Sequence, residues 1–380
     1  MTYKKNAIWI ETRAELVQLV ELLSKEPRIA IDTESNSLFA YTEQVCLIQF
    51  TIPSGDYLVD PLAIDDLSPL GPVFSDPGIE KIFHAVEYDV ICLKRDFGFT
   101  FDHIFDTMIG ARTLGWKKIG LGALLEEHFQ VKANKKYQRA NWGTRPLEAK
   151  MLEYARTDTH YLIALRDIIQ KELLAAGRWE LANEYFQQMA HVAIPEPVDP
   201  IMACWRSCRQ WDFSKKQLNA LYELCSYREF EAKKMNRPPF KVLNKEILID
   251  VAMACPKDRE MLSQSVRLTR HQMRRFGDGL LRAVQRGLTR EPRSFKRNHS
   301  YPEEPYHTNL DVLRNWRKLK ARDLGVESDV VLSRDILEMI ADKNPQSALK
   351  LKEIMAPVPV RYEQFGRSIL ESLEKVRIHP

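Results

Sequence analysis

The sequence predicts an α/β domain followed by two small all-helical domains. Short β-branched runs alternate with helical patterns in the first 200 residues, which is typical of an α/β sheet. Beyond about residue 205 the patterns are all helical, and the layout of one helical stretch recurs about 90 residues later. Two proline-rich segments, 193–200 and 289–305, mark the boundaries. We therefore expect domains at 1–200, 205–288 and 306–380, with a linker at 289–305.

The strands of the first domain are expected at 29–34, 45–51, 56–60, 81–84 and 104–107. The first of them runs into Asp32-Thr33-Glu34. Because residues two apart on a strand face the same side, both carboxylates point one way. They repel each other unless a cation lies between them. On its own, however, an Asp-x-Glu after an apolar run is more often a helix cap or a solvated turn.

Two expected helices supply further candidates for the same site. The helix over 84–97 carries Asp89 near its start, and the helix over 151–165 places Tyr154 and Asp158 on one face, four residues apart. Singly, such residues are usually surface charges or a partly buried Tyr. Together with the strand carboxylates they have the make-up of a two-metal phosphodiesterase site. Mg²⁺ and Mn²⁺ prefer hard oxygen ligands, and two such ions can activate water and stabilise a leaving oxygen.

The three segments resemble motifs ExoI, ExoII and ExoIII of the DEDD exonuclease superfamily. Asp32 and Glu34 match ExoI, Asp89 matches ExoII, and Asp158 matches ExoIII. Tyr154, four residues before Asp158, identifies the Tyr form of ExoIII. The stretch NWGTRPL at 141–147, leading into YARTDTHYL, resembles the ribonuclease D family. One departure is Asn141, where that family is expected to have Asp before the Trp.

The helical half extends the resemblance. Residues 218–252 and 310–341 each resemble an HRDC domain, with Asn244 and Ser333 at expected N-cap positions. An exonuclease domain followed by two such modules is the layout of the ribonuclease D family, and the resemblance covers nearly the whole chain. It implies a ribonuclease H-like fold for the first domain.

The same resemblance implies an activity and roles for the site residues. Asp32 would bridge two divalent ions, Mg²⁺ or Mn²⁺, with Glu34 and Asp158 on the first ion and Asp89 on the second. Tyr154 would hold the attacking water through its hydroxyl. The chain would remove nucleotides stepwise from RNA 3′ ends and release 5′-mononucleotides, with transfer RNA precursors as expected partners.

Some residues and functions stay open. His84 and His160 are interpreted as structural rather than catalytic, and Asp102 and Asp106 are given no metal role. One alternative function is a 3′–5′ DNA exonuclease, because the motifs contain nothing that senses a 2′-hydroxyl and HRDC modules also occur in DNA helicases. Another is a non-catalytic RNA-binding protein that has kept the fold.

Charge is distributed unevenly along the chain. Residues 1–200 hold 21 Lys and Arg against 29 Asp and Glu, whereas residues 201–380 hold 35 against 23. The stretch 257–297 alone has 12 basic and 4 acidic residues. A solvated basic face is the plain interpretation, but beside a phosphodiesterase site we favour contacts with a phosphate backbone. The candidate nucleic-acid contacts are Arg270, Arg274, Arg275, Arg282 and Arg286.

The remaining composition suggests a soluble, cytoplasmic protein. The first residues lack an apolar leader pattern, and no apolar run approaches 18 residues, so no membrane partner is expected. Six cysteines lie mostly in apolar helical or strand-like patterns. Cys204 and Cys208 are four apart on one helix but lack a paired Cys/His cluster, which disfavours zinc. We expect reduced, buried thiols. No protein partner can be inferred.

Overall fold

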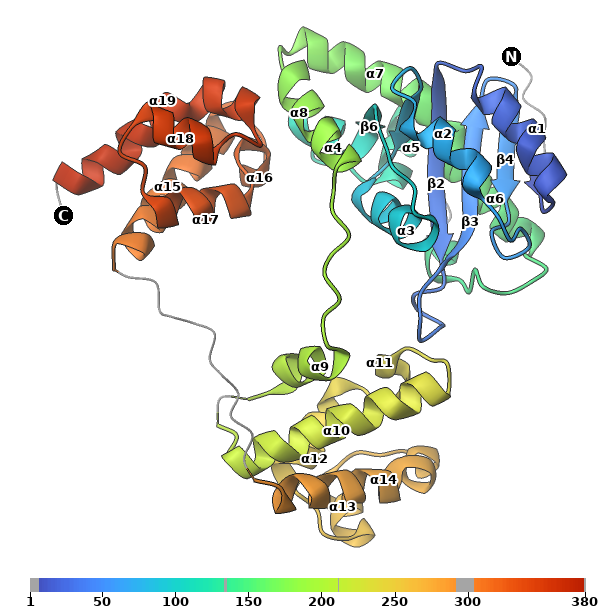
Figure 1. The fold of residues 1–380 in the computed structure, drawn as a ribbon, viewed down its shortest axis with the longest axis vertical. Helices are drawn as coiled ribbons and strands as arrows, with labels where there is room; N and C mark the ends of the chain where they lie inside the picture. The colour runs from blue at the N-terminus through green and yellow to red at the C-terminus, as the bar shows by residue number, and fades with distance from the viewer. Residues whose placement is uncertain (1–6, 133–134, 211, 292–303, 379–380) are drawn as a thin grey trace. The chain divides into compact units, whose positions relative to one another are not determined.

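The computed structural model describes residues 7–132, 135–210, 212–291 and 304–378. The chain divides into two compact units. Unit 1 consists of Met1–Glu34, Val45–Ile194 and Asn298–Pro380, and unit 2 of Ser35–Gln44 and Pro195–Arg297. Unit 1 therefore contains the sheet domain and the last helical bundle, while unit 2 contains the first helical bundle. The architecture is a mixed α/β domain followed by helical domains, as predicted (Figure 1).

A six-stranded sheet in the order β1-β4-β3-β2-β5-β6 forms the centre of the first domain. The strands are β1 (Ile8–Ile10), β2 (Arg28–Ser35), β3 (Val45–Ile52), β4 (Gly55–Val59), β5 (Glu80–Phe83) and β6 (Ile104–Asp106). Strand β1 pairs in parallel with β4, β3 pairs antiparallel with β4, and β5 pairs in parallel with both β2 and β6. All five predicted strands are present. The three-residue strand β1 was not predicted, because it is too short to show a period.

The helices of the first domain are α1 (Arg13–Leu23), α2 (Gly71–Ser75), α3 (Glu87–Phe97), α4 (Thr107–Leu114), α5 (Leu121–Phe129), α6 (Ala149–His160), α7 (Leu162–Ala175) and α8 (Trp179–Ala190), with short 3₁₀ turns η1 (Ser68–Leu70) and η2 (Lys135–Arg139). Two helix predictions need correction. The helix expected over 84–97 begins at Glu87, because Ala85 has a left-handed φ of 66°. The helix expected over 151–165 is interrupted at Tyr161, which separates α6 from α7.

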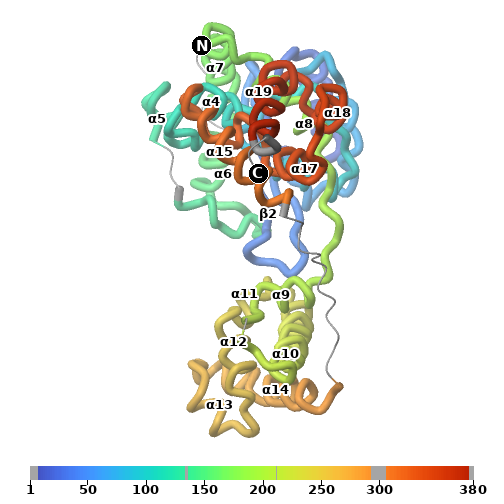
Figure 2. The backbone as a smooth tube through the Cα atoms, turned by 90° about the vertical axis from the view of Figure 1, so that its left-hand side faces the viewer, coloured from blue at the N-terminus to red at the C-terminus, as the bar shows by residue number. Residues whose placement is uncertain are grey.

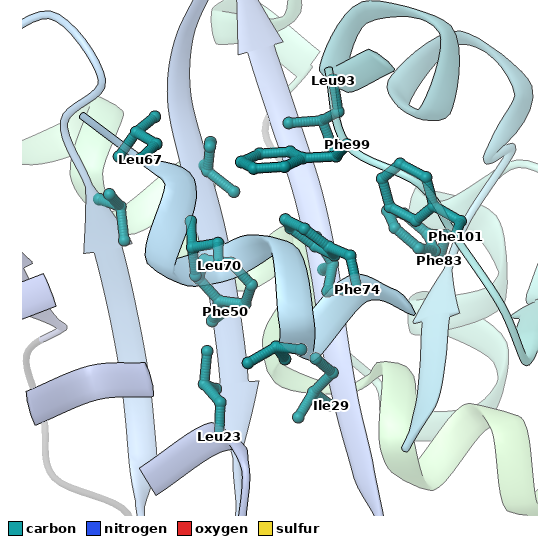
Figure 3. Close-up of a cluster of buried hydrophobic side chains, with 14 of the residues drawn as sticks. Leu23, Ile29, Phe50, Leu67, Leu70, Phe74, Phe83, Leu93, Phe99 and Phe101 are labelled. Carbon is teal, nitrogen blue, oxygen red and sulfur yellow. The ribbon is translucent and has the colours of Figure 1, made fainter. Parts of the chain in front are cut away.

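Two hydrophobic cores cover opposite faces of strand β2. Ile29 and Ile31 belong to one core, in which Phe74 of α2 packs among other aromatic rings (Figure 3). Ala30, between them, belongs to the other core with Leu162 and Leu165 of α7. The alternation follows from the period of two along a strand. It places the side chains of even-numbered β2 residues on the face that α6 and α7 cover.

The first helical bundle, in unit 2, contains α9 (Pro200–Cys208), α10 (Lys215–Lys234), α11 (Pro239–Val242), α12 (Lys245–Ala254), α13 (Arg259–Ser265) and α14 (Arg270–Thr289). Helices α10 and α14 lie side by side (Figures 1 and 2). They approach closely at Gly287, where an added Cβ would lie 2.4 Å from Ala220 Cα. Asn244 caps α12 as predicted, since its side chain accepts a hydrogen bond from Ile247 N at 3.0 Å.

The second helical bundle contains α15 (Glu304–Leu324), α16 (Ser328–Val331), α17 (Arg334–Lys343), α18 (Ala348–Ile354) and α19 (Pro359–Ile378). Ser333 occupies the predicted N-cap position of α17, but its side chain makes no capping hydrogen bond. The predicted linker over 289–305 lies mostly outside the described residues. Thr289 ends α14, and α15 begins at Glu304.

Helix α8 of the sheet domain supplies side chains that complete two helix ends of this bundle. Glu184 accepts a hydrogen bond from Val360 N at 2.6 Å, at the start of α19, and pairs with the fully buried Arg361. Arg178, just before α8, donates to Leu324 O at 2.6 Å, at the end of α15, and also to Leu114 O at 3.0 Å, at the end of α4. Cations are favourable at helix C-termini and carboxylates at N-termini.

The cysteines depart from the prediction of reduced thiols. Cys204 of α9 and Cys225 of α10 form a disulfide, with their Cα atoms 5.9 Å apart. Cys46, Cys92, Cys208 and Cys255 take no part in this disulfide. The pairing could not be predicted because the two residues are 21 positions apart and meet only when α9 packs on α10.

Among the described residues, no helix has the length and apolar composition that crossing a membrane requires.

The buried pair of Arg361 and Glu184 yields a test of the fold. Arg361→Met should lower the free energy of opening of α19 by about 3–5 kcal/mol, because it leaves the Glu184 carboxylate buried without its cation. Native-state hydrogen exchange at the α19 amides measures this energy. Arg367→Met is the matched control on the same helix; its side chain is 94% exposed, and the expected change is within about 0.5 kcal/mol. Equal effects of the two substitutions would contradict the role of the buried Arg361–Glu184 pair in holding α19.

Candidate active site

The acidic residues of strand β2 lie on the face covered by α6. Asp32 and Glu34 continue the even-numbered series that begins at the buried Ala30, so both carboxylates point to one side. Helix α6 packs on the neighbouring strands β3 and β4. The sheet therefore presents both carboxylates to a helix that is itself fixed on the same sheet.

Helix α6 brings Asp158 to the strand carboxylates. Oxygen atoms of Asp32, Glu34 and Asp158 all lie within 4.8 Å of one another. Tyr154, one turn earlier on α6, hydrogen-bonds Asp158 through its hydroxyl. The Tyr154 ring is 6.1 Å from that of the buried Trp142, which lies in the segment that precedes α6. Trp142 thus packs beside the ring that carries the Tyr154 hydroxyl.

Asp89 comes from α3 and lies beside this group rather than within it. Its carboxylate accepts a hydrogen bond from the Thr33 hydroxyl, between Asp32 and Glu34 on β2. Asp89 is 6% exposed and is close enough for its charge to act on both Asp32 and Glu34. The structure therefore brings all five predicted site residues into one region, with three of the four carboxylates in closest contact.

Two further buried carboxylates hold the helices that carry the site. Asp106 accepts hydrogen bonds from Val86 N at 2.7 Å, at the start of α3, and from Met108 N at 2.7 Å, at the start of α4. Asp56 of β4 accepts hydrogen bonds from Thr51 at 2.7 Å and from Arg156 of α6 at 3.2 Å. These contacts fix α3 and α6, and so the positions of Asp89 and Asp158.

The site carboxylates hold their protons more tightly than ordinary acids. Burial, followed by repulsion from Asp89, Asp158 and Glu34, raises the pKa of Asp32 well above its ordinary value. Burial, followed by repulsion from Asp158 and Asp89, does the same to the pKa of Glu34. Burial raises the pKa of Asp89 and of Asp158 to about 7. A bound cation would offset the burial and the mutual repulsion that disfavour the ionised carboxylates.

Tyr154 remains a proton donor over the whole physiological pH range. Burial, together with the negative charges of Asp158, Glu34 and Asp32, raises the pKa of its phenol far above the ordinary value. A protonated phenol can donate one hydrogen bond and accept another.

The two histidines near the motifs make structural contacts. His84 Nδ1 lies 2.9 Å from the Thr107 hydroxyl, and burial lowers the pKa of its imidazole. His160 Nδ1 lies 2.8 Å from Asp56, in the network that anchors α6. Asn141, the departure from the family pattern, accepts a hydrogen bond from Gly143 N at 3.3 Å and so stabilises a turn.

Three residues next to the site were not predicted. Thr33 holds Asp89, Asp106 caps both helices, and the fully buried Gln49 of β3 donates to Asp32 at 3.4 Å while its side-chain oxygen has no partner. A signal for Gln49 was present, because it is a polar residue within the apolar strand VCLIQFTI. The hydroxyl of Thr33 and the caps of Asp106 give no such signal, since both depend on distant partners.

The five predicted arginine contacts lie on α14 and are all exposed. Arg270, Arg274, Arg282 and Arg286 are spaced by multiples of four, with Asp278 at the vacant position of the series, so neighbouring members lie one turn apart. Arg286 is already paired with Glu223 of α10 at 3.1 Å, so it is less available than the others.

The donor set fits hard divalent cations. Asp32, Glu34 and Asp158 offer carboxylate oxygens in a group tight enough to hold one ion, and Asp89 adds a fourth carboxylate beside it. Mg²⁺ and Mn²⁺ are bound by such oxygen ligands.

Comparison with known protein families agrees with the domain layout. The family model described as 3′–5′ exonuclease matches residues 7–174. The model described as HRDC domain matches twice, at residues 217–284 and 308–373.

Individual relatives are similar to this chain over part of its length or over nearly all of it. The protein RRP6-like 3 of Arabidopsis thaliana is 43% identical over 44% of this chain and 19% of its own length. Ribonuclease D of Nitrobacter hamburgensis is 29% identical over 87% of both chains. The crystal structure of Escherichia coli RNase D shares the fold over 99% of both chains, with a TM-score of 0.71 and 24% identity.

The chain spans between 19% and 36% of the length of six curated RRP6-type and exosome-component relatives. It matches ribonuclease D of Nitrobacter hamburgensis over 87% of that protein's length. With a 3′–5′ exonuclease domain followed by two HRDC domains, and with the carboxylates of the three motifs gathered at one place, the chain is a homologue of ribonuclease D.

Proposed function

We propose that the protein is a 3′–5′ exoribonuclease that removes nucleotides one at a time from RNA 3′ ends and releases 5′-mononucleotides. The observation that carries the proposal is the tight group of Asp32, Glu34 and Asp158, with Asp89 beside it and Tyr154 bonded to Asp158. Similarity to ribonuclease D of Nitrobacter hamburgensis supports RNA as the substrate.

The four carboxylates would hold two divalent ions, Mg²⁺ or Mn²⁺. Asp32, Glu34 and Asp158 would bind one ion, and Asp32 with Asp89 would bind the other. When bound, such ions make a water more acidic and neutralise charge on the leaving oxygen. The buried hydrogen bonds of Asp106 and Asp56 keep the ligands in place while the substrate changes.

Tyr154 would orient the attacking water. Its hydroxyl stays protonated and lies next to Asp158, so it can donate to or accept from a water held between them. Trp142 packs beside the ring that carries this hydroxyl. Positioning of this kind lowers the entropy cost of the attack.

Transfer RNA precursors with 3′ extensions are the substrate we propose. The exposed arginines of α14 give unit 2 a basic face, which suits a folded RNA with many phosphates. The decisive experiment is incubation of the protein and Mg²⁺ with such a precursor, and with a DNA of matched sequence, followed by product mapping. Faster cleavage of DNA would favour a DNA exonuclease, and RNA binding without any product would indicate a non-catalytic protein.

The metal-free protein should lose stability as the pH rises. The site carboxyls have folded-state pKa values above the unfolded value of about 4, so the stability they contribute is present below that value. It is lost as the pH rises through about 7, the pKa of Asp89 and Asp158. We expect the Tm in the presence of a chelator to fall between pH 5 and pH 8, and Mg²⁺ to reverse the fall.

Asp32→Asn is the matched variant for this measurement. It removes one of the repelling charges, so its metal-free Tm should fall less with pH, and its turnover at saturating Mg²⁺ should be lost. Near-normal turnover would contradict the site assignment, as would a wild-type Tm that rises between pH 5 and pH 8 without metal.

Tyr154→Phe should lower kcat by a factor on the order of ten to a thousand, the range for removing one positioned catalytic group. The KM should change little, because the hydroxyl is proposed to hold water rather than RNA. Single-turnover and steady-state assays on one oligonucleotide separate the two. A change confined to KM would make Tyr154 a substrate contact instead.

Replacing Arg270, Arg274, Arg275 and Arg282 by Gln should weaken binding of the transfer RNA precursor and lower its salt dependence. Each arginine–phosphate ion pair that is removed reduces the log–log salt slope by roughly 0.7 to 0.9. The control replaces four exposed basic residues on other elements, Lys25, Lys171, Lys350 and Arg367, which keeps the change in net charge the same. Equal log–log salt slopes for the two variants would mean that the α14 arginines do not contact RNA and form only a solvated surface.

A further inference from the structure

A second cluster of reactive side chains lies in the first helical bundle, in unit 2. The Sγ atoms of Cys204, Cys208 and Cys225 all lie within 4.8 Å of one another. Cys204 and Cys208 occupy successive turns of α9, and both face Cys225 of α10. Two of the three sulfurs are joined as the Cys204–Cys225 disulfide, and the third is a free, fully buried thiol. The free thiol therefore lies beside a disulfide that it can reach from the same helix.

A buried cation lies close enough to Cys208 for their charges to interact. Arg228 follows Cys225 by one turn of α10 and is 9% exposed. Its guanidinium donates a long hydrogen bond to Leu243 O at 3.5 Å, and within the described parts of the chain its Nε has no partner. Burial lowers the pKa of Arg228, while the negative charges that Cys208 and Glu229 can carry act in the opposite direction. The Glu229 carboxylate also accepts the hydroxyl of Tyr41.

A buried guanidinium with few hydrogen bonds is costly unless an anion lies close to it. The thiolate is the species that attacks disulfides. The three sulfurs lie close enough together for the Cys208 thiol to reach the disulfide, and the buried Arg228 lies near enough to Cys208 for their charges to interact.

We propose that Cys204, Cys208 and Cys225 form a thiol–disulfide exchange centre, in which Cys208 is the attacking thiolate and Arg228 its counter-ion. The Cys208 thiolate attacks Cys225 Sγ, a Cys208–Cys225 bond forms, the Cys204–Cys225 bond breaks, and Cys204 leaves as the thiolate. The exchange is neutral in redox and in charge, so it needs no external oxidant. The cross-link between α9 and α10 moves by one turn of α9.

The proposal is independent of the nuclease activity, because all of its residues lie in α9 and α10 of unit 2. It also differs from a metal site built on the same three sulfurs. A metal would require all three cysteines to be reduced, whereas exchange requires one disulfide at all times.

Disulfide mapping of the full-length protein tests the proposal directly. Trypsin cuts after Arg206, Arg209, Lys216 and Arg228, so the three cysteines fall in three different peptides. The protein is equilibrated in a mixed glutathione buffer, quenched in acid and alkylated, and the linked peptides are identified by mass spectrometry. We expect both the Cys204–Cys225 and the Cys208–Cys225 linkages in the wild type.

Single substitutions give the expected patterns of linkage. Cys208→Ser should leave the Cys204–Cys225 linkage alone, and Cys204→Ser should show the Cys208–Cys225 linkage. Arg228→Met should slow the appearance of that second linkage after a redox jump by about tenfold, because exchange follows the thiolate fraction. Cys255→Ser removes a free cysteine outside the cluster and should change neither linkage. Circular dichroism of each variant checks that the bundle stays folded.

Two results would overturn the proposal. One is a wild type with the Cys204–Cys225 linkage alone, together with a Cys204→Ser variant whose Cys208 and Cys225 remain separate. The other is a wild type in which all three thiols are reduced, whether or not one equivalent of zinc is found by elemental analysis; bound zinc would establish a metal site instead.

Discussion

Mutual repulsion among four buried carboxylates is the constraint around which the exonuclease domain is arranged. Asp32, Glu34, Asp89 and Asp158 come from three elements, and each has a pKa raised by burial. Without a cation, every one of them would be better placed farther from the others. The fold must therefore resist that force with contacts that do not depend on the site itself. The hydrogen bonds between the strands hold Asp32 and Glu34, but the two helices need separate anchors.

Those anchors are themselves acidic residues, which serve as hydrogen-bond acceptors rather than as candidate metal ligands. Asp106 accepts the free N–H groups at the starts of α3 and α4, the groups that a helix cannot satisfy internally. Asp56 of β4 holds α6 through Arg156 and His160, and it also accepts a hydrogen bond from Thr51 of β3. Burial alone thus does not mark a carboxylate as a ligand. What separates the two groups is their surroundings. The anchors accept several hydrogen bonds each, whereas the site carboxylates lie next to other carboxylates and accept few hydrogen bonds, such as those from Thr33, Gln49 and Tyr154.

The sequence allowed the site residues to be predicted better than the contacts that hold them. Asp32 and Glu34 follow from the period of a strand, and Tyr154 and Asp158 from the spacing of a helix, because both patterns are local. The break at Tyr161 was missed, since the apolar pattern runs on from α6 into α7 with neither Gly nor Pro between them. The disulfide of Cys204 and the pairing of Arg286 with Glu223 join residues 21 and 63 positions apart, and no periodic pattern reports such distances. The roles of the site residues in catalysis, and of the α14 arginines in RNA binding, stay predictions.

The side chains in and next to α8 limit how such proteins can change during evolution. Arg178 and Glu184 of the sheet domain complete helix ends in the last bundle, and Leu181 is part of that bundle's core. A recombination that exchanged this bundle for an unrelated one would leave the Arg178 cation and the Glu184 carboxylate of the sheet domain without their partners. A lineage without the last bundle would have to replace Arg178, Leu181 and Glu184 as well. Selection therefore acts here on the sheet domain and the last bundle together, which is a larger unit than either domain alone.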